Sequence, residues 1–175
     1  MLGIIKRKEV PVFDTTKPVL GIDIGNVITG DTDKSVLFTD AYLDVPEIPG
    51  AFRTIAKLYH IFSEQVCLVS KCRGVVQVKT RHWLLHHNFF KITGVDPNHV
   101  FFCEERKGKS PICKFLGVTH FVDGRLEVLE YLENVRHQFL FCPNEKEIIR
   151  HYKHFHNVVR VENWNDLYNL IQMTF

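Results

Sequence analysis

The regular alternation of short apolar runs with longer amphipathic stretches constrains the fold of this chain more than any other feature. A short apolar run bounded by turn-forming residues is typical of a strand that is buried on both faces. We expect six such strands, at residues 19–24, 66–70, 100–103, 120–123, 139–142 and 158–161. Because helical spacing separates them, the sequence predicts an α/β fold: a doubly wound, Rossmann-like, mostly parallel sheet with helices on both faces.

Apolar residues at helical spacing mark the connections between the expected strands. The first helix begins at Pro49, because proline is favoured in a first turn, and the second runs unbroken over residues 75–90. A short helix starts near Ser110 and ends at Gly117, and the last helix is capped by Asn163. The apolar stripes of the expected helices consist of Phe52, Ile55, Ala56, Tyr59, Val76, Trp83, Phe90, Leu126, Leu129, Leu132, Trp164, Leu167, Tyr168 and Ile171.

The composition is that of an ordinary globular protein and predicts a single domain over residues 1–175. A chain of 175 residues, 45% of them hydrophobic and 24% charged, is long enough to bury a substantial core. We expect residues 1–17 to form a leader segment on the surface, with its basic side chains in solvent. A formal net charge of +2 is too small to indicate a nucleic-acid or membrane partner by itself.

Cysteine usage and the first residues indicate an intracellular, cytoplasmic protein. The five cysteines form an odd number and include no C-x-x-C pair, which argues against a disulfide framework and against a zinc site built on paired cysteines. Charged residues at positions 6–9 interrupt the first apolar run, so we expect no signal peptide. No run of 18 apolar residues occurs, so we expect no membrane span.

Several expected strands are followed by side chains that are suited to phosphoryl transfer. Asp23, Ser70 and Asp123 end three of these strands, and Lys107 and Lys109 precede a helix. The carboxyl ends of parallel strands meet at one edge of a sheet, so these residues are expected to share a pocket. A carboxylate attacks phosphorus, a hydroxyl and an ammonium hold phosphate oxygens, and a second carboxylate helps to bind Mg²⁺.

These segments resemble the four motifs of the haloacid dehalogenase superfamily. Residues 23–27 are similar to its first motif, residues 68–70 to its second, and residues 119–123 to its fourth. Lys109 is similar to the lysine of the third motif, and Lys107 is the alternative. The resemblance implies that Asp23 is the nucleophile, that Ser70, Lys109 and Asn26 bind phosphate, and that Asp23, Asp123 and the Gly25 carbonyl hold Mg²⁺.

Two positions depart from the pattern of that superfamily. Its members usually carry a general acid/base two residues after the nucleophile, where this chain has Gly25, and such a loss can lower the rate about 10²–10⁴-fold. The fourth motif often has a second aspartate, where this chain has Gly124. Glu127 could replace that carboxylate through water, and Asp31 is another acid to test as a proton donor.

The spacing of the motifs leaves no room for a sizeable cap domain. The resemblance therefore implies a capless, Mg²⁺-dependent phosphatase that acts through an aspartyl-phosphate on a phosphorylated substrate, and it favours a bulky or macromolecular one. A nucleic-acid substrate rests only on the open site and several basic residues. The alternative is a catalytically impaired relative that binds a phosphate ligand or a protein, and Gly25 and Gly124 motivate it.

Overall fold

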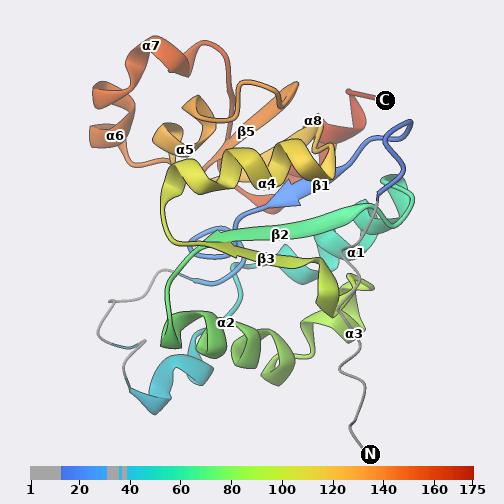
Figure 1. Cartoon of the computed structure of the whole chain (residues 1–175), viewed down its shortest axis with the longest axis vertical. Helices are drawn as coiled ribbons and strands as arrows, with labels where there is room; N and C mark the ends of the chain where they lie inside the picture. Colours follow the sequence, from blue (N-terminus) through green and yellow to red (C-terminus); the bar gives the residue numbers. More distant parts are fainter. Residues whose placement is uncertain (1–12, 31–35, 37–38) are drawn as a thin grey trace, which may run out of the picture.

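The computed structural model describes residues 13–30, 36 and 39–175, and within them six strands form one parallel sheet. The strands are β1 (Leu20–Ile22), β2 (Val66–Lys71), β3 (Val100–Cys103), β4 (His120–Asp123), β5 (His137–Phe141) and β6 (Val159–Val161). Their order in the sheet is β3-β2-β1-β4-β5-β6. The chain thus builds outward from β1 through β2 to β3 and then crosses to β4 on the other side, so β1 and β4 flank the point where the strand order reverses (Figure 1).

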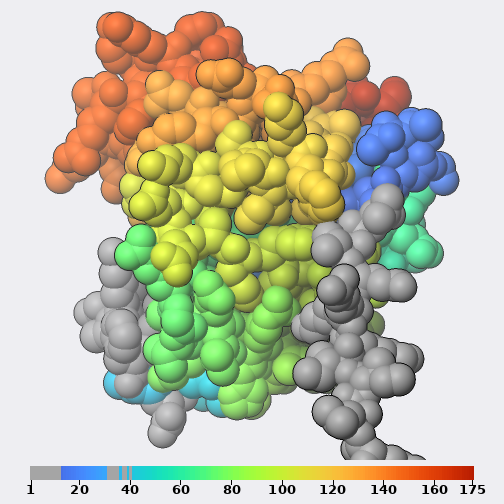
Figure 2. Space-filling model, in the orientation of Figure 1, coloured from blue at the N-terminus to red at the C-terminus, as the bar shows by residue number. Residues whose placement is uncertain are grey.

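The helices and 3₁₀ turns fill the connections between the strands. The helices are α1 (Ala51–Ile61), α2 (Val75–His86), α3 (Phe89–Thr93), α4 (Lys109–Leu116), α5 (Leu126–Glu130), α6 (Glu145–Arg150), α7 (Tyr152–Phe155) and α8 (Trp164–Gln172), and the 3₁₀ turns are η2 (Asp40–Asp44), η3 (Pro97–His99) and η4 (Arg106–Gly108). In the space-filling view, α6 and α7 (orange) lie at one end of the molecule and α2 (green) at the other (Figure 2).

Alternate residues of β2, β3, β4 and β5 belong to two separate hydrophobic clusters, one on each face of the sheet. In β2, Val66 and Leu68 pack with residues of α1, α2, α3 and α8, whereas Cys67 and Val69 pack with residues of α4 and α5. Since side chains alternate along a strand, a strand that is apolar at every position must be covered on both faces. The predicted doubly wound α/β sheet with helices on both faces is therefore confirmed.

Close packing of β1 against β4 depends on a glycine. A Cβ atom added to Gly21 would lie 2.5 Å from Cδ2 of Phe121, a ring that is completely buried. Because that ring occupies the space where a side chain would be, β1 and β4 pair directly, with Gly21 opposite Phe121. The glycine thus helps to bring the ends of these two strands together.

The helices depart from the sequence predictions at two places. The helix expected over 75–90 is divided into α2 and α3, because Asn88 adopts a left-handed conformation with φ of 55°, which asparagine tolerates better than most residues. In α1, Leu58 is fully buried, whereas the predicted core residues Ala56 and Tyr59 are only partly buried. The last helix follows the prediction, since Asn163 accepts a hydrogen bond from the backbone N–H of Asp166 at its start.

Several expectations concern segments that the structure describes only in part. Of the leader segment, residues 1–12 lie outside the described residues, and Phe13 is buried while Asp14 bonds to Gln65.

All five cysteines are free thiols. Among the described helices, none combines the length and the apolar character needed to cross a bilayer.

A buried histidine at the amino-terminal end of β4 makes stability depend on pH. His120 is 4% exposed and stacks on His137 and Phe175, and its ring nitrogens bond to Thr119 and Thr174. Burial, with smaller contributions from the nearby charges of His137 and Arg136, lowers the pKa of His120 to about 4. The folded protein therefore resists protonation of this ring more than the unfolded chain does.

We expect the free energy of unfolding to fall as the pH drops from about 6.5 to 4. Over this range His120 becomes protonated in the unfolded chain but stays neutral in the folded protein. This residue should account for about 2 kcal/mol of the loss, since one pKa unit corresponds to about 1.4 kcal/mol and part of the shift is screened. Urea unfolding at pH 7, 5.5 and 4 measures the effect. His120→Gln should flatten the pH dependence, whereas His60→Gln, at an exposed site, should leave it unchanged; equal slopes in both variants contradict the assignment.

Candidate active site

Asp23 lies directly after β1, at the carboxyl edge of the sheet. Its backbone N–H donates to the carbonyl of Val122, 2.9 Å away, so the pairing of β1 with β4 continues as far as this residue. The chain then turns sharply, because the Ile24 carbonyl accepts hydrogen bonds from the backbone N–H groups of Ile28 (2.9 Å) and Thr29 (3.0 Å). Asn26 occupies the left-handed position of this turn, with φ of 59°.

Two helices from distant parts of the chain fix the turn after Asp23. The indole Nε1 of Trp164, at the start of α8, donates to the Val27 carbonyl at 2.9 Å. The N–H of Ile48, just before α1, donates to the Ile28 carbonyl at 2.8 Å. The turn is therefore held from outside as well as by its own hydrogen bonds.

Lys109 joins two aspartates at the centre of the site. Its Nζ lies 2.7 Å from Oδ1 of Asp23 and 2.7 Å from Oδ2 of Asp123. The side chains of Lys109 and Asp123 are almost completely buried, while that of Asp23 is 15% exposed. Asp23, Lys109 and Asp123 therefore lie together in one pocket, as the sequence predicts. Their chemical roles stay predictions.

The electrostatics of this group favour a charged lysine. Burial alone would lower the pKa of Lys109, but the charges of Asp123 and Asp23 outweigh it and raise the pKa above its ordinary value. For Asp123, burial raises the pKa, and the Lys109 ammonium opposes that effect. With both carboxylates ionised the group carries a net charge of −1, so one further positive charge would balance it.

Backbone and helix geometry orient the two buried partners. Asp123 is the last residue of β4, and its Oδ1 accepts a hydrogen bond from the backbone N–H of Arg125 at 2.9 Å. Lys109 is the first residue of α4, so its side chain points back over the end of the sheet. Lys107, the alternative for the motif lysine, is exposed and pairs with Glu105 at 3.1 Å. Lys109, and not Lys107, thus lies beside the two aspartates.

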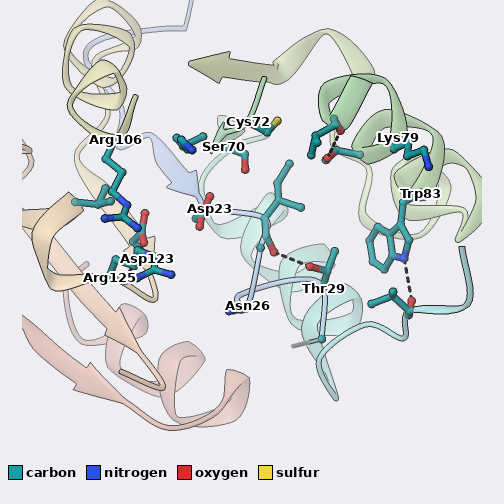
Figure 3. A pocket seen from close by; sticks show the side chains of 18 of the residues that line it. Asp23, Asn26, Thr29, Ser70, Cys72, Lys79, Trp83, Arg106, Asp123 and Arg125 are labelled. Atoms are coloured by element: carbon teal, nitrogen blue, oxygen red, sulfur yellow. Dashed lines mark hydrogen bonds between the residues drawn. The ribbon is translucent and has the colours of Figure 1, made fainter. Parts of the chain in front are cut away.

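A cavity of about 430 Å³ opens above the aspartates. Ser70, at the carboxyl end of β2, and Asn26 line it together with Asp23, Lys109 and Asp123, so every predicted site residue reaches one space (Figure 3). Figure 3 also shows that Asp23 lies between a side formed by Arg106 and Arg125 and a side formed by Lys79 and Trp83. Trp83 is held there by a hydrogen bond from its Nε1 to the Val45 carbonyl at 2.8 Å.

The two arginines are functional candidates that lie outside the four motifs. Arg106 belongs to the charged loop before α4, and Arg125 follows Asp123 by two residues. Because both residues follow closely after strand ends, at Cys103 and Asp123, their positions in the sequence could have predicted a place at the same edge of the sheet. Glu127 does not line this cavity, because its carboxylate accepts hydrogen bonds from Arg106 and from the Tyr131 hydroxyl. Asp31 lies outside the described residues.

The donor atoms at the site fit a magnesium ion. Mg²⁺ prefers oxygen ligands and is usually bound by one or two carboxylates, with water and substrate phosphate completing its octahedron. Asp23 and Asp123 supply the carboxylates, and the Gly25 carbonyl receives no hydrogen bond from the described residues. Among the described residues, no three His, Cys, Asp or Glu side chains cluster as ligands of one metal ion.

Comparison with solved structures supports the fold. A protein of Burkholderia xenovorans LB400, provisionally described as a haloacid dehalogenase-like hydrolase, superposes with a TM-score of 0.53 and 16% sequence identity, over 77% of this chain and 62% of its own. DsGPDH of Dunaliella salina gives a TM-score of 0.46 at 15% identity, over 73% of this chain and 24% of its own. This chain therefore spans less than two thirds of either structure. No protein-family profile and no curated protein sequence matches it.

We expect Lys109→Met to lower the free energy of unfolding by about 3–5 kcal/mol, because it leaves two carboxylates side by side without the cation between them. Lys114→Met, at an exposed position of the same helix, should change it by less than about 0.5 kcal/mol. Denaturant unfolding at pH 7 measures both. Adding Asp123→Asn to Lys109→Met should restore part of the loss by removing one charge. A double variant less stable than the single one would show that the pairing is not the source of the effect.

Proposed function

We propose that this protein is a Mg²⁺-dependent phosphomonoester hydrolase of the haloacid dehalogenase type that acts through an aspartyl-phosphate. The observation that carries the proposal is the Lys109 ammonium held between Asp23 and Asp123 where the strand order reverses. Ligands of open α/β sheets bind at this place, outside the carboxyl ends of the strands. The shared fold with the Burkholderia protein supports the same assignment at the level of the fold.

In the first step, an Asp23 oxygen attacks phosphorus, the bond from phosphorus to the ester oxygen breaks, and the leaving group takes up a proton from solvent. Oδ1 of Asp23 is paired with Lys109, and no donor among the described residues contacts Oδ2, which makes Oδ2 the candidate attacking atom. In the second step, water attacks the phosphorus of the aspartyl-phosphate, the bond from phosphorus to the Asp23 oxygen breaks, and a proton of the water passes to solvent. Orthophosphate leaves, and the Asp23 carboxylate is regenerated.

Ser70, Asn26 and Lys109 hold the phosphoryl group in this proposal. All three line the cavity with Asp23 and supply a hydroxyl, an amide and an ammonium as donors. Donors fixed in advance stabilise the charge that develops on phosphate oxygens in the transition state. When bound by Asp23, Asp123 and the Gly25 carbonyl, Mg²⁺ would neutralise negative charge at the phosphoryl group.

Gly25 decides which substrates are cleaved well. It stands where the superfamily usually has the acid that protonates the leaving oxygen, and the cavity lining contains no carboxylates besides Asp23 and Asp123 among the described residues. A Cβ atom built on Gly25 meets no heavy atom within 4 Å, and its φ is not positive, so a longer side chain fits. Esters with good leaving groups are therefore the favoured substrates.

We propose a capless, cytoplasmic enzyme whose site is open to large phosphorylated molecules. Between β1 and β2 the described residues form only η2 and α1, and between β2 and β3 only α2, α3 and η3. These elements line one side of the cavity through Tyr42, Val76 and Trp83. A bulky substrate could therefore extend away from Asp23 without meeting a separate cap domain.

We expect Asp23→Asn to abolish turnover of an aryl phosphate, because an amide cannot act as the nucleophile, while orthophosphate binds as tightly as before or more tightly. Phosphate release and isothermal titration measure the two properties. Wild-type turnover should disappear with EDTA and return with Mg²⁺, and Glu133→Gln, at an exposed position, should behave as wild type. A wild type that binds orthophosphate but never turns over any phosphate ester would identify a phosphate-binding module instead.

We expect wild-type protein to cleave aryl phosphates far faster than alkyl phosphates, since a good leaving group needs no protonation. Gly25→Asp should raise the rate on alkyl phosphates about 10²-fold by supplying the acid, and it should change the aryl rate much less. Gly25→Asn is the matched control, because it has the same size and donates no proton to the leaving oxygen. Equal wild-type rates on both esters would show that another residue already supplies the proton.

A further inference from the structure

We propose that the substrate carries a second phosphate group, which binds to Arg106 and Arg125 beside the reacting one. The proposal rests on the phosphatase assignment above and names the class of its substrate as doubly phosphorylated. Both arginines line the cavity that contains Asp23, although they come from η4 and from the residue that precedes α5. Their side chains are 38% and 46% exposed, so both are accessible to a ligand.

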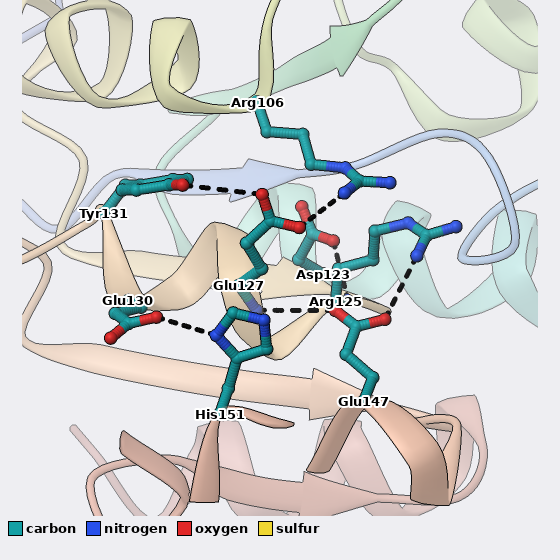
Figure 4. A network of polar contacts seen from close by, with 8 residues as sticks. All are labelled: Arg106, Asp123, Arg125, Glu127, Glu130, Tyr131, Glu147 and His151. Carbon is teal, nitrogen blue, oxygen red and sulfur yellow. Dashed lines mark hydrogen bonds and ion pairs between the residues drawn. The ribbon is translucent and has the colours of Figure 1, made fainter. Parts of the chain in front are cut away.

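Each arginine is held in place by a carboxylate on its outer side. Nη1 of Arg106 pairs with Oε2 of Glu127, and Nη1 of Arg125 lies 3.0 Å from Oε2 of Glu147. The two glutamates are linked to each other, because the backbone N–H of Glu127 donates to Oε1 of Glu147 at 3.4 Å. Figure 4 shows this network, with Asp123 next to Arg125, whose backbone N–H donates to it.

The guanidinium groups keep donors available for a ligand. A guanidinium has five N–H donors, and each carboxylate here engages a single terminal nitrogen. Among the described residues, Nε and Nη2 of Arg106 and of Arg125 have no hydrogen-bond partner. A planar fork of this kind matches two oxygens of one phosphate, which makes arginine well suited to phosphate recognition.

The cavity offers more donors than one phosphate uses in this proposal. Ser70, Asn26 and Lys109 serve the reacting phosphate, so the two arginines supply further N–H donors on the Asp123 side. Arg125 also borders a second hollow of about 580 Å³, which is lined by Asp23, Asp123 and Glu147 as well as by Lys146 and Arg150. A second phosphate placed at the arginines would thus have two further cationic side chains in the adjoining hollow.

The test compares phosphonates with one and with two anionic groups, so it does not require turnover. We expect wild type, at pH 7.5 with fixed Mg²⁺, to bind methylenebisphosphonate or propylenebisphosphonate about tenfold more tightly than methylphosphonate, as charge-assisted contacts would give. Arg106→Gln and Arg125→Gln should each remove most of that gain and leave methylphosphonate affinity unchanged. Titration calorimetry measures the affinities, and Arg53→Gln, at an exposed site of α1, is the control that should keep the gain.

The matched variants Glu127→Gln and Glu147→Gln separate ligand binding from structural pairing. They break the same two ion pairs but keep the arginines, so bisphosphonate affinity should stay within about threefold of wild type or increase. A wild type that binds neither probe, or binds both equally, overturns the proposal, as does a loss in the glutamate variants equal to that in the arginine variants. A bisphosphonate gain without any phosphate-ester turnover would instead reject the phosphatase function and leave the two-phosphate site standing.

Discussion

The arrangement of this molecule depends on the contact of one buried ammonium with two carboxylates. Lys109 is 1% exposed, and a lysine in that position is stable only when opposite charges surround it. Asp23 and Asp123 supply those charges from the ends of β1 and β4, and Lys109 comes from the start of α4. Two features of the fold therefore bring these three side chains together: the close approach of β1 to β4 at Gly21, and the position of α4 over the sheet.

Most of the fold and the floor of the site could be predicted because they follow from local patterns. Apolar runs gave strands close to their observed bounds, and their alternation with helices gave a parallel sheet. A parallel sheet collects its strand ends at one edge, so Asp23, Ser70 and Asp123 were expected together before any contact was known. That expectation needed only the order of the elements, which the hydrophobic pattern contains.

What the sequence pattern missed depends on contacts between distant elements. Spacing could not separate Lys107 from Lys109, because the difference is that one faces solvent and the other lies between two carboxylates. Spacing also could not show that Glu127 is paired with Arg106, which comes from the loop after β3. The break at Asn88 also has a tertiary setting, since Phe89 must turn into the core to pack on Phe52. None of these pairings can be predicted from the local spacing of apolar residues, because each joins residues that are distant in the sequence.

The hydrogen bond from Trp164 to the turn after Asp23 has a consequence for how the protein is made. The chain is synthesised from its amino end, so β1 and Asp23 are made first. Lys109, the cation that pairs with Asp23, is made only after β3, and Trp164, which holds the turn, is made with α8. During synthesis the Asp23 carboxylate is thus without its ammonium partner until Lys109 has been made. The turn that follows Asp23 is therefore fully held only once a residue 137 positions beyond Val27 has been made.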